Sequence, residues 1–138
     1  MMNMYLLQKI NKEAEKVEFI IKRCLQKNKE DRYQSIEEMQ KDLANILKIE
    51  YKSLLEKSKE KKDVQATKYY CSELLLLNIK IGNLEDAYIY ADDLKNYVSN
   101  EIRKEIDNIC EEIKERKERK IEVSEMFIEK VREVIHKA

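Results

Sequence analysis

Apolar residues recur at spacings of three and four along most of the chain, which is the period of an amphipathic helix. The pattern is clearest between Phe19 and Leu47, where two apolar stripes are separated by the polar run that starts at Lys27. The stripes consist of Ile20, Ile21, Cys24 and Leu25, and of Ile36, Met39, Leu43, Ile46 and Leu47. This stretch predicts a helical hairpin in which each helix buries one face.

Local signals place the ends of these helices. Ser35 stands three residues before Glu38, the spacing of a capping box, and predicts the start of the second helix. The first helix is expected to begin near residue 4 or after Asn11. Tyr51, Leu54 and Leu55 prolong the second stripe up to residues 56–63, a run without an apolar member. We interpret that run as a frayed helix end and a loop.

A second hairpin is predicted between residues 64 and 98. Asp63 can cap a helix with a stripe that ends at Ile81, Gly82 suits a left-handed C-terminal cap, and Asn83 can cap the next helix at once. The stripes of the two helices contain Ala66, Tyr70, Leu74, Leu77 and Ile81, and Leu84, Ala87, Ala91, Leu94 and Val98.

Residues 100–137 contain no helix breaker and repeat apolar residues in a heptad-like order. The seam consists of Ile102, Ile106, Ile109 and Ile113, then of Lys117 and Lys120, and then of Ser124, Phe127, Val131 and Val134. Such a helix either bends near Lys117–Lys120 and folds back, which we favour, or projects to meet a partner. A coiled-coil homodimer through this seam is the corresponding alternative.

Composition agrees with an all-α protein. The chain has 138 residues, no proline, one glycine and 41% charged residues, and no stretch alternates with a period of two. We expect antiparallel helical hairpins that form a bundle or a short helical-repeat array, with a long C-terminal helix or helix pair. The expected organisation is a hairpin over residues 1–55, a polar loop over 56–63 and a helical region over 64–138 that can pack with the first part as one domain.

The charge balance restricts the expected classes of partner, and the cysteines indicate the expected compartment. The 28 basic and 28 acidic residues balance, which argues against nucleic acid and anionic membranes as partners. No apolar run approaches the ~20 residues of a membrane span, and the N-terminal residues lack the features of a secretory signal. Three widely spaced cysteines suit a reducing compartment, so we expect a cytoplasmic protein.

The sequence contains few candidates for catalytic or metal-binding residues. His136 is the only histidine, and Glu133 precedes it at the spacing found in di-iron bundles, but such a site needs a second histidine. We therefore predict no catalytic residue, no cofactor and no metal site. Five tyrosines in the second hairpin pack with their hydroxyls at its edge or form a partner surface; they are Tyr69, Tyr70, Tyr88, Tyr90 and Tyr97.

The segment from Ile20 to Ser35 resembles the end of the C-terminal lobe of bacterial-type serine/threonine protein kinases. In that family a helix ending in Cys-Leu precedes Lys-Asp-Pro-x-x-Arg-Tyr-x-Ser and the final helix; here Cys24-Leu25 precedes a loop containing Arg32-Tyr33. The resemblance covers residues 11–48 and departs from the family at two prolines, replaced by Lys12 and Lys29. It implies that Arg32, with Ser35 and Glu38 nearby, is a structural residue that pairs with the glutamate of an Ala-Pro-Glu motif.

The catalytic parts of a kinase are absent from the sequence. A kinase needs a glycine-rich loop, His-Arg-Asp and Asp-Phe-Gly, and the chain has none of these motifs and no Ala-Pro-Glu. We predict a non-enzymatic interaction or scaffold module, the C-terminal portion or remnant of a serine/threonine kinase, whose protein partner is a kinase lobe, substrate or regulator. The alternatives are an unrelated helical bundle or homodimer, and a subunit that completes a separately encoded kinase lobe.

The hairpin over residues 64–98 is similar to a tetratricopeptide repeat. The likeness rests on Gly82 and Ala87, which match the family's Gly-x-x-x-x-Ala turn into the second helix. Cys71 replaces the family's aromatic residue, no proline closes the unit, and no second copy follows at a 34-residue period. The resemblance implies helices that approach closely through small alanines.

Overall fold

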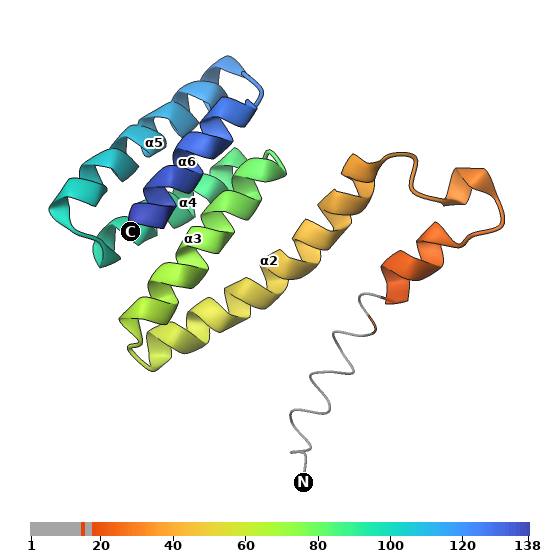
Figure 1. Ribbon diagram of the computed structural model, residues 1–138, viewed down its shortest axis with the longest axis horizontal. Coiled ribbons are helices and arrows are strands. Elements are labelled where there is room, and N and C mark those ends of the chain that lie inside the picture. Colours follow the sequence, from red (N-terminus) through yellow and green to blue (C-terminus); the bar gives the residue numbers. More distant parts are fainter. Residues whose placement is uncertain (1–14, 16–17) are drawn as a thin grey trace, which may run out of the picture. The chain divides into compact units, whose positions relative to one another are not determined.

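A computed structural model describes residue 15 and residues 18–138, and these residues form helices, turns and loops without a strand (Figure 1). The expected all-α fold is therefore confirmed. The start of the first helix, the position Lys12 and the first residues of the kinase-like segment lie outside the described residues. The chain divides into two compact units, an N-terminal unit, Met1–Leu47, and a C-terminal unit, Lys48–Ala138.

The N-terminal unit contains a helical segment over residues 18–24, a loop with the short 3-10 helix η1 (Lys29–Asp31), and the first part of α2. Helix α2 (Ile36–Glu60) is continuous across the division between the units. The sequence suggested a boundary at residues 56–63. The division in the structure falls upstream of these residues, after Leu47. That polar run forms the end of α2 and a turn in which Lys62 has a left-handed φ of 56°.

The prediction that the kinase-like hairpin buries its apolar stripes is wrong for most of the residues in those stripes. Within the described part of the N-terminal unit, Ile20 and Ala44 are buried, whereas Leu25 is 77% exposed and Ile36 is 66% exposed. Leu43 and Leu47 are also exposed. The helical period identified which residues share a face, but burial requires a second surface to cover that face.

The C-terminal unit continues with α3 (Val64–Lys80), α4 (Leu84–Leu94), the 3-10 helix η2 (Lys95–Tyr97), α5 (Asn100–Arg119) and α6 (Glu125–Lys137). The predicted caps are confirmed: the side chain of Asp63 accepts from the Ala66 N–H, and that of Asn83 accepts from the Asp86 N–H. Gly82 has a φ of +79°, the left-handed conformation that lets α3 end and α4 begin without a longer loop.

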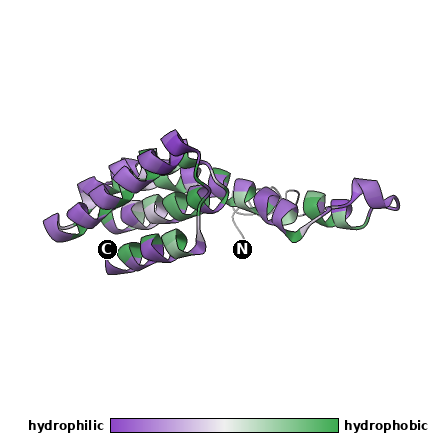
Figure 2. Cartoon of the chain, turned by 90° about the horizontal axis from the view of Figure 1, so that it is seen from above, coloured by the Kyte–Doolittle hydropathy of each residue, from purple (hydrophilic) through white to green (hydrophobic). Residues whose placement is uncertain are grey.

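Helices α3 to α6 form a closed ring. Each packs against the next in chain order, and α6 returns to pack against α3 (Figure 1). In Figure 2 the helices near the C-terminus carry hydrophobic inner sides and hydrophilic outer sides. Of the bundle and the open repeat array that the sequence allowed, the packing is that of a bundle, because stacked repeats contact only their neighbours.

The bundle has a continuous apolar core to which every helix contributes. Its members with under 2% exposure include Leu74, Leu75, Ile79, Leu94, Ile106, Ile109, Ile113 and Val131. Burying each such side chain contributes ~1.5–3 kcal/mol before the entropy cost of ordering it. Three of the heptad-like isoleucines of α5, Ile106, Ile109 and Ile113, are thus buried within one chain, and Ile102 is partly buried beside them. An intermolecular coiled coil through these residues would require the bundle to open.

The long C-terminal helix is broken where the sequence predicted a bend. Helix α5 ends at Arg119, and Lys120 adopts a left-handed conformation with a φ of 55°. Ser124 then caps α6 by accepting from the Phe127 N–H at 3.2 Å. The expected folding back is confirmed, since α6 packs along α5.

Candidate functional site

The Arg32 guanidinium closes the kinase-like loop through backbone carbonyls. Its Nε donates to the Gln26 carbonyl at 2.7 Å, and Nη2 donates to the Lys27 carbonyl at 3.3 Å. Both carbonyls belong to the loop that follows the helical segment 18–24, so the guanidinium satisfies backbone acceptors of the loop and holds it closed. Arg32 is exposed, and its remaining donors can meet another acidic group.

Ser35 and Glu38 form a capping arrangement that differs by one residue from the expected box. The Ser35 Oγ accepts from the Glu38 N–H at 3.2 Å, as predicted. The Glu38 carboxylate accepts from the Gln34 N–H at 2.9 Å rather than from Ser35. Two hydrogen bonds, one accepted by Ser35 and one accepted by Glu38, therefore join the end of the loop to the first turn of α2.

A polar cluster that the sequence analysis missed joins the helical segment 18–24 to α2. The Arg23 guanidinium lies 4.2 Å from the centre of the Tyr33 ring and forms ion pairs with Glu38 and Asp42. The Tyr33 hydroxyl donates to Asp42 at 2.8 Å. Partial burial and this bond raise the pKa of Tyr33. The Arg-Tyr pairing spans ten positions and has no periodic signature, so only the three-dimensional fold reveals it.

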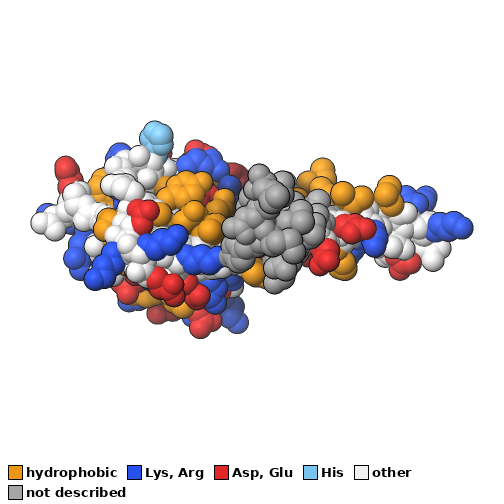
Figure 3. Space-filling model, turned by 90° about the horizontal axis from the view of Figure 1, so that it is seen from below, with side chains coloured by type: hydrophobic (Ala, Val, Ile, Leu, Met, Phe, Trp, Pro, Cys, Tyr) orange, Lys and Arg blue, Asp and Glu red, His pale blue; other side chains and the backbone are white. Residues whose placement is uncertain are grey.

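The described part of the N-terminal unit exposes a large share of its apolar side chains. Figure 3 shows hydrophobic side chains on the surface of this unit, whose far end is mostly polar and charged. The exposed residues are Phe19, Ile21, Leu25, Ile36, Leu43 and Leu47. Single exposed apolar residues are ordinary in a folded protein, so it is their number on one short segment that distinguishes this unit from the C-terminal bundle.

Two of the five candidate tyrosines lie where α3 faces α2. The Tyr69 and Tyr70 rings meet edge to face at 5.4 Å between centres, and Tyr70 lies 6.0 Å from the ring of Tyr51 on α2. Tyr69 is 54% exposed, whereas Tyr70 packs against the core. Tyr69 alone of this pair presents most of its ring to solvent.

The other three tyrosines are half-buried and come from α4 and η2. The ring of Tyr88 lies beside α5, 5.2 Å from the Lys114 ammonium nitrogen. Burial, with a smaller contribution from Asp86, raises the pKa of Tyr90. Tyr97 lies in η2. Among the described rings no aromatic contact joins these residues to Tyr69 and Tyr70, so the structure does not gather the five into one aromatic cluster.

Both cysteines of the C-terminal unit, Cys71 and Cys110, are buried. Cys71 is fully buried and its thiol donates to Asp93 at 3.5 Å, while the same carboxylate accepts from Lys59 at 2.6 Å. Burial, reinforced by Asp93, raises the pKa of Cys71 to about 12. Burial also raises the pKa of Cys110. Both thiols remain protonated at neutral pH.

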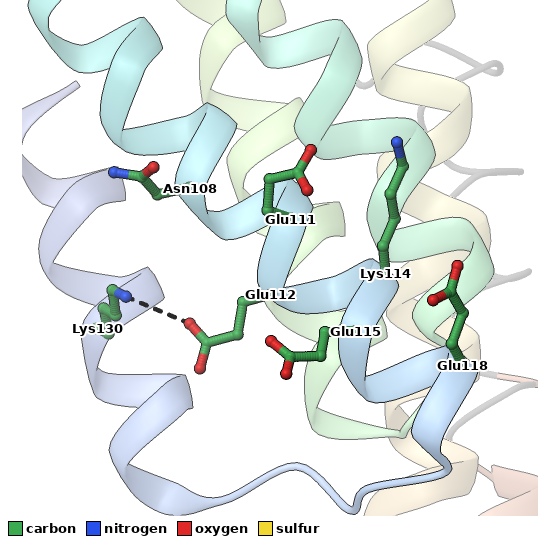
Figure 4. Close-up of a pocket in the computed structure, with 7 residues that line it drawn as sticks. All are labelled: Asn108, Glu111, Glu112, Lys114, Glu115, Glu118 and Lys130. Carbon is green, nitrogen blue, oxygen red and sulfur yellow. Dashed lines mark hydrogen bonds and ion pairs between the residues drawn. The ribbon is translucent and has the colours of Figure 1, made fainter.

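A hollow on the outer side of α5 collects glutamates (Figure 4). Its acidic members are Glu111, Glu112, Glu115 and Glu118. Glu112 is neutralised by Lys130 of α6 and by Arg116, each at 3.3 Å. In the part of the chain that the structure describes, no three acidic, histidine or cysteine side chains are grouped to hold a metal ion. We interpret this hollow as a solvated helix face.

Comparison with known proteins gives no relative from which a role could be transferred. No family model, no curated protein and no solved structure matches the chain. None of the described helices is long and apolar enough to cross a bilayer.

Proposed function

We propose that the chain is a non-catalytic helical interaction module, the C-terminal portion or remnant of a serine/threonine protein kinase. In this proposal the N-terminal hairpin is the docking element and its partner is the body of a kinase C-terminal lobe. The C-terminal bundle acts as an attached scaffold. The observation that carries the proposal is the contrast in burial between the two units.

That contrast is large. Leu25 and Ile36 are 77% and 66% exposed on the hairpin, while the core leucines and isoleucines of the bundle are fully buried. A final helical hairpin that evolved against a kinase lobe would keep this apolar surface, because the rest of the lobe would cover it. A self-sufficient bundle has no such requirement.

Arg32 supports the same proposal. Its guanidinium is exposed and bonds with backbone carbonyls of its own loop, which orients the side chain without neutralising its charge. An arginine held in this way is prepared for a bidentate bond with a carboxylate of a partner. The kinase resemblance assigns that carboxylate to the glutamate of Ala-Pro-Glu.

The test is complementation in trans. The full chain is co-expressed with a bacterial-type serine/threonine kinase domain truncated before its last two helices, and soluble yield and phosphotransfer are measured. We expect the chain to restore both, and Arg32→Ala to abolish the restoration. Gln34→Ala is the matched control, because it removes loop bonds to the Lys29 and Arg32 carbonyls but keeps the guanidinium. Absence of rescue by the unaltered chain, or equal losses in the two variants, would contradict the proposal.

A further inference from the structure

A groove between α4 and α5 combines an apolar floor with a basic rim. One part of it, of about 280 Å³, is lined by Leu84, Glu85, Tyr88, Ile89, Ile113, Lys114 and Lys117. A second hollow, of about 340 Å³, shares Leu84, Glu85 and Lys117 and extends to Lys120 and Ile121. The two hollows are therefore adjacent, and together they are called the α4–α5 groove; they lie where α4 begins and α5 ends.

The floor of the groove contains apolar side chains that remain exposed to solvent. Ile89 is 55% exposed and Ile121 is 45% exposed, whereas Ile113, which lines the same hollow as Ile89, is buried. Tyr88 and Leu84 are half-buried beside them. A partner that covered these side chains would be stabilised by the removal of their apolar surface from water.

Three lysines border this floor. Lys114 lies over the Tyr88 ring, so its ammonium stays beside the groove. Lys117 is 57% exposed, and its one ion pair with a described residue is a 4.0 Å contact with Glu85, itself 75% exposed. Lys120 forms no ion pair with any described residue. The acidic residue that lines the groove itself is Glu85, whereas Glu111, Glu115 and Glu118 line a neighbouring hollow together with Lys114.

We infer that the α4–α5 groove binds an acidic amphipathic helix of a protein partner. Apolar side chains at spacings of three and four would cover Tyr88, Ile89 and Ile121, and flanking carboxylates would meet the rim lysines. Helix-in-groove binding of this kind uses a short apolar stripe for affinity. The lysines contribute specificity and a faster encounter, because an acidic helix is attracted and a basic one is repelled.

This inference rests on the proposed role as an interaction module and adds a second surface to it. The two surfaces consist of different residues, since one belongs to the N-terminal hairpin and the other to the bundle. Lys114→Glu/Lys117→Glu should leave the kinase-lobe rescue unchanged, and Arg32→Ala should leave groove binding unchanged. Failure of one test therefore does not imply failure of the other.

The probe is a stapled, fluorescent helical peptide of about 15 residues, long enough for four turns. It carries leucines at helical spacing and glutamates on both flanks, and its binding to the full chain is followed by fluorescence anisotropy. A second peptide has lysine in place of every glutamate, and a third keeps the charge but scrambles the leucines. We expect binding by the first peptide alone.

The variants decide where the peptide binds. Lys114→Glu/Lys117→Glu should weaken binding about tenfold or more, whereas Lys104→Glu, an exposed lysine on the same helix, should leave it unchanged. Amide chemical-shift changes should cluster over residues 82–89 and 113–121. Absence of binding, equal binding of the lysine peptide, or shifts confined to residues 19–47 would overturn the inference. So would sedimentation showing that a second copy of the chain occupies the groove and that the peptide does not displace it.

Discussion

Arg116 connects three parts of the turn between α5 and α6. Its guanidinium donates to the Glu122 carbonyl at 2.6 Å, pairs with Glu112 and lies 4.7 Å from the centre of the Phe127 ring. The side chain is only 15% exposed, so its charge-assisted bonds are partly shielded from water.

Arg116→Ala should lower the free energy of unfolding by about 1–3 kcal/mol, because it removes a charge-assisted bond and uncovers an aromatic face. Urea denaturation followed by circular dichroism measures this change. Arg119→Ala is the control: Arg119 is 70% exposed and pairs with Glu115 on its own helix, so the loss should stay within about 0.5 kcal/mol. Equal effects of the two substitutions would contradict the role assigned to Arg116.

Cys71 gives stability a dependence on alkaline pH. Its pKa is raised from the ordinary value of 9.0 to about 12 in the folded chain, by burial first and by Asp93 second. Above pH 9 the unfolded state releases a proton that the folded state keeps, so the free energy of unfolding falls as the pH rises. The contribution of this thiol is a slope of ~1.4 kcal/mol per pH unit between about pH 9 and pH 12.

Urea denaturation at a series of pH values measures this slope. Cys71→Ala should lose stability less steeply with pH than the unaltered chain, by one proton. Cys24→Ala, which replaces an exposed thiol, should keep the original slope. A Cys71→Ala profile parallel to that of the unaltered chain would exclude the buried thiol as the cause.

Residue-scale signals were predictable where they act over a few positions. Asp63, Gly82 and Asn83 occupy the capping roles that their spacing indicated, because a cap depends on atoms within one turn of helix. The cluster of Arg23, Tyr33 and Asp42 was missed, since its partners meet only after the loop has folded. Helix caps can therefore be predicted from a sequence, whereas contacts between side chains on either side of a loop cannot.

For individual helices, the apolar pattern predicted where a helix ends but not whether its apolar face is buried. The sequence predicted the break near Lys117–Lys120 because lysines interrupt the apolar seam there, and α5 ends at Arg119. It did not predict that the apolar face of α2 would be exposed at Leu43 and Leu47. Periodicity defines a face, and the burial of that face depends on another part of the fold.

The turn between α2 and α3 offers a prediction at this scale. Lys62 adopts a φ of 56°, a conformation that costs an L-residue other than glycine roughly 1–2 kcal/mol. Lys62→Gly should therefore raise the free energy of unfolding by about 0.5–1 kcal/mol, after the greater flexibility of glycine in the unfolded chain is included. Lys61→Gly, at the neighbouring position without a positive φ, should not stabilise. A lower melting temperature for Lys62→Gly would contradict this reading of the turn.

At the scale of the whole molecule, the sequence defined the fold class but not the closure of the bundle. Composition and spacing predicted helices throughout, yet the contact of α6 with α3 joins segments about 60 residues apart and has no local signal. The same closure buries Ile106, Ile109 and Ile113 inside one chain. The uneven burial of the two units, which carries the functional proposal, is likewise a property of the assembled fold.

The most direct test of that unevenness is native-state hydrogen exchange of the full chain, read by mass spectrometry of peptic peptides. We expect the amides of α3 and α5 to exchange only through global unfolding, and those of residues 18–47 to exchange through far less costly local opening. Addition of the truncated kinase lobe should slow exchange in residues 18–47 alone. Protection of residues 18–47 equal to that of α3 in the isolated chain would contradict the account, because the hairpin would then be stable without a partner to cover it.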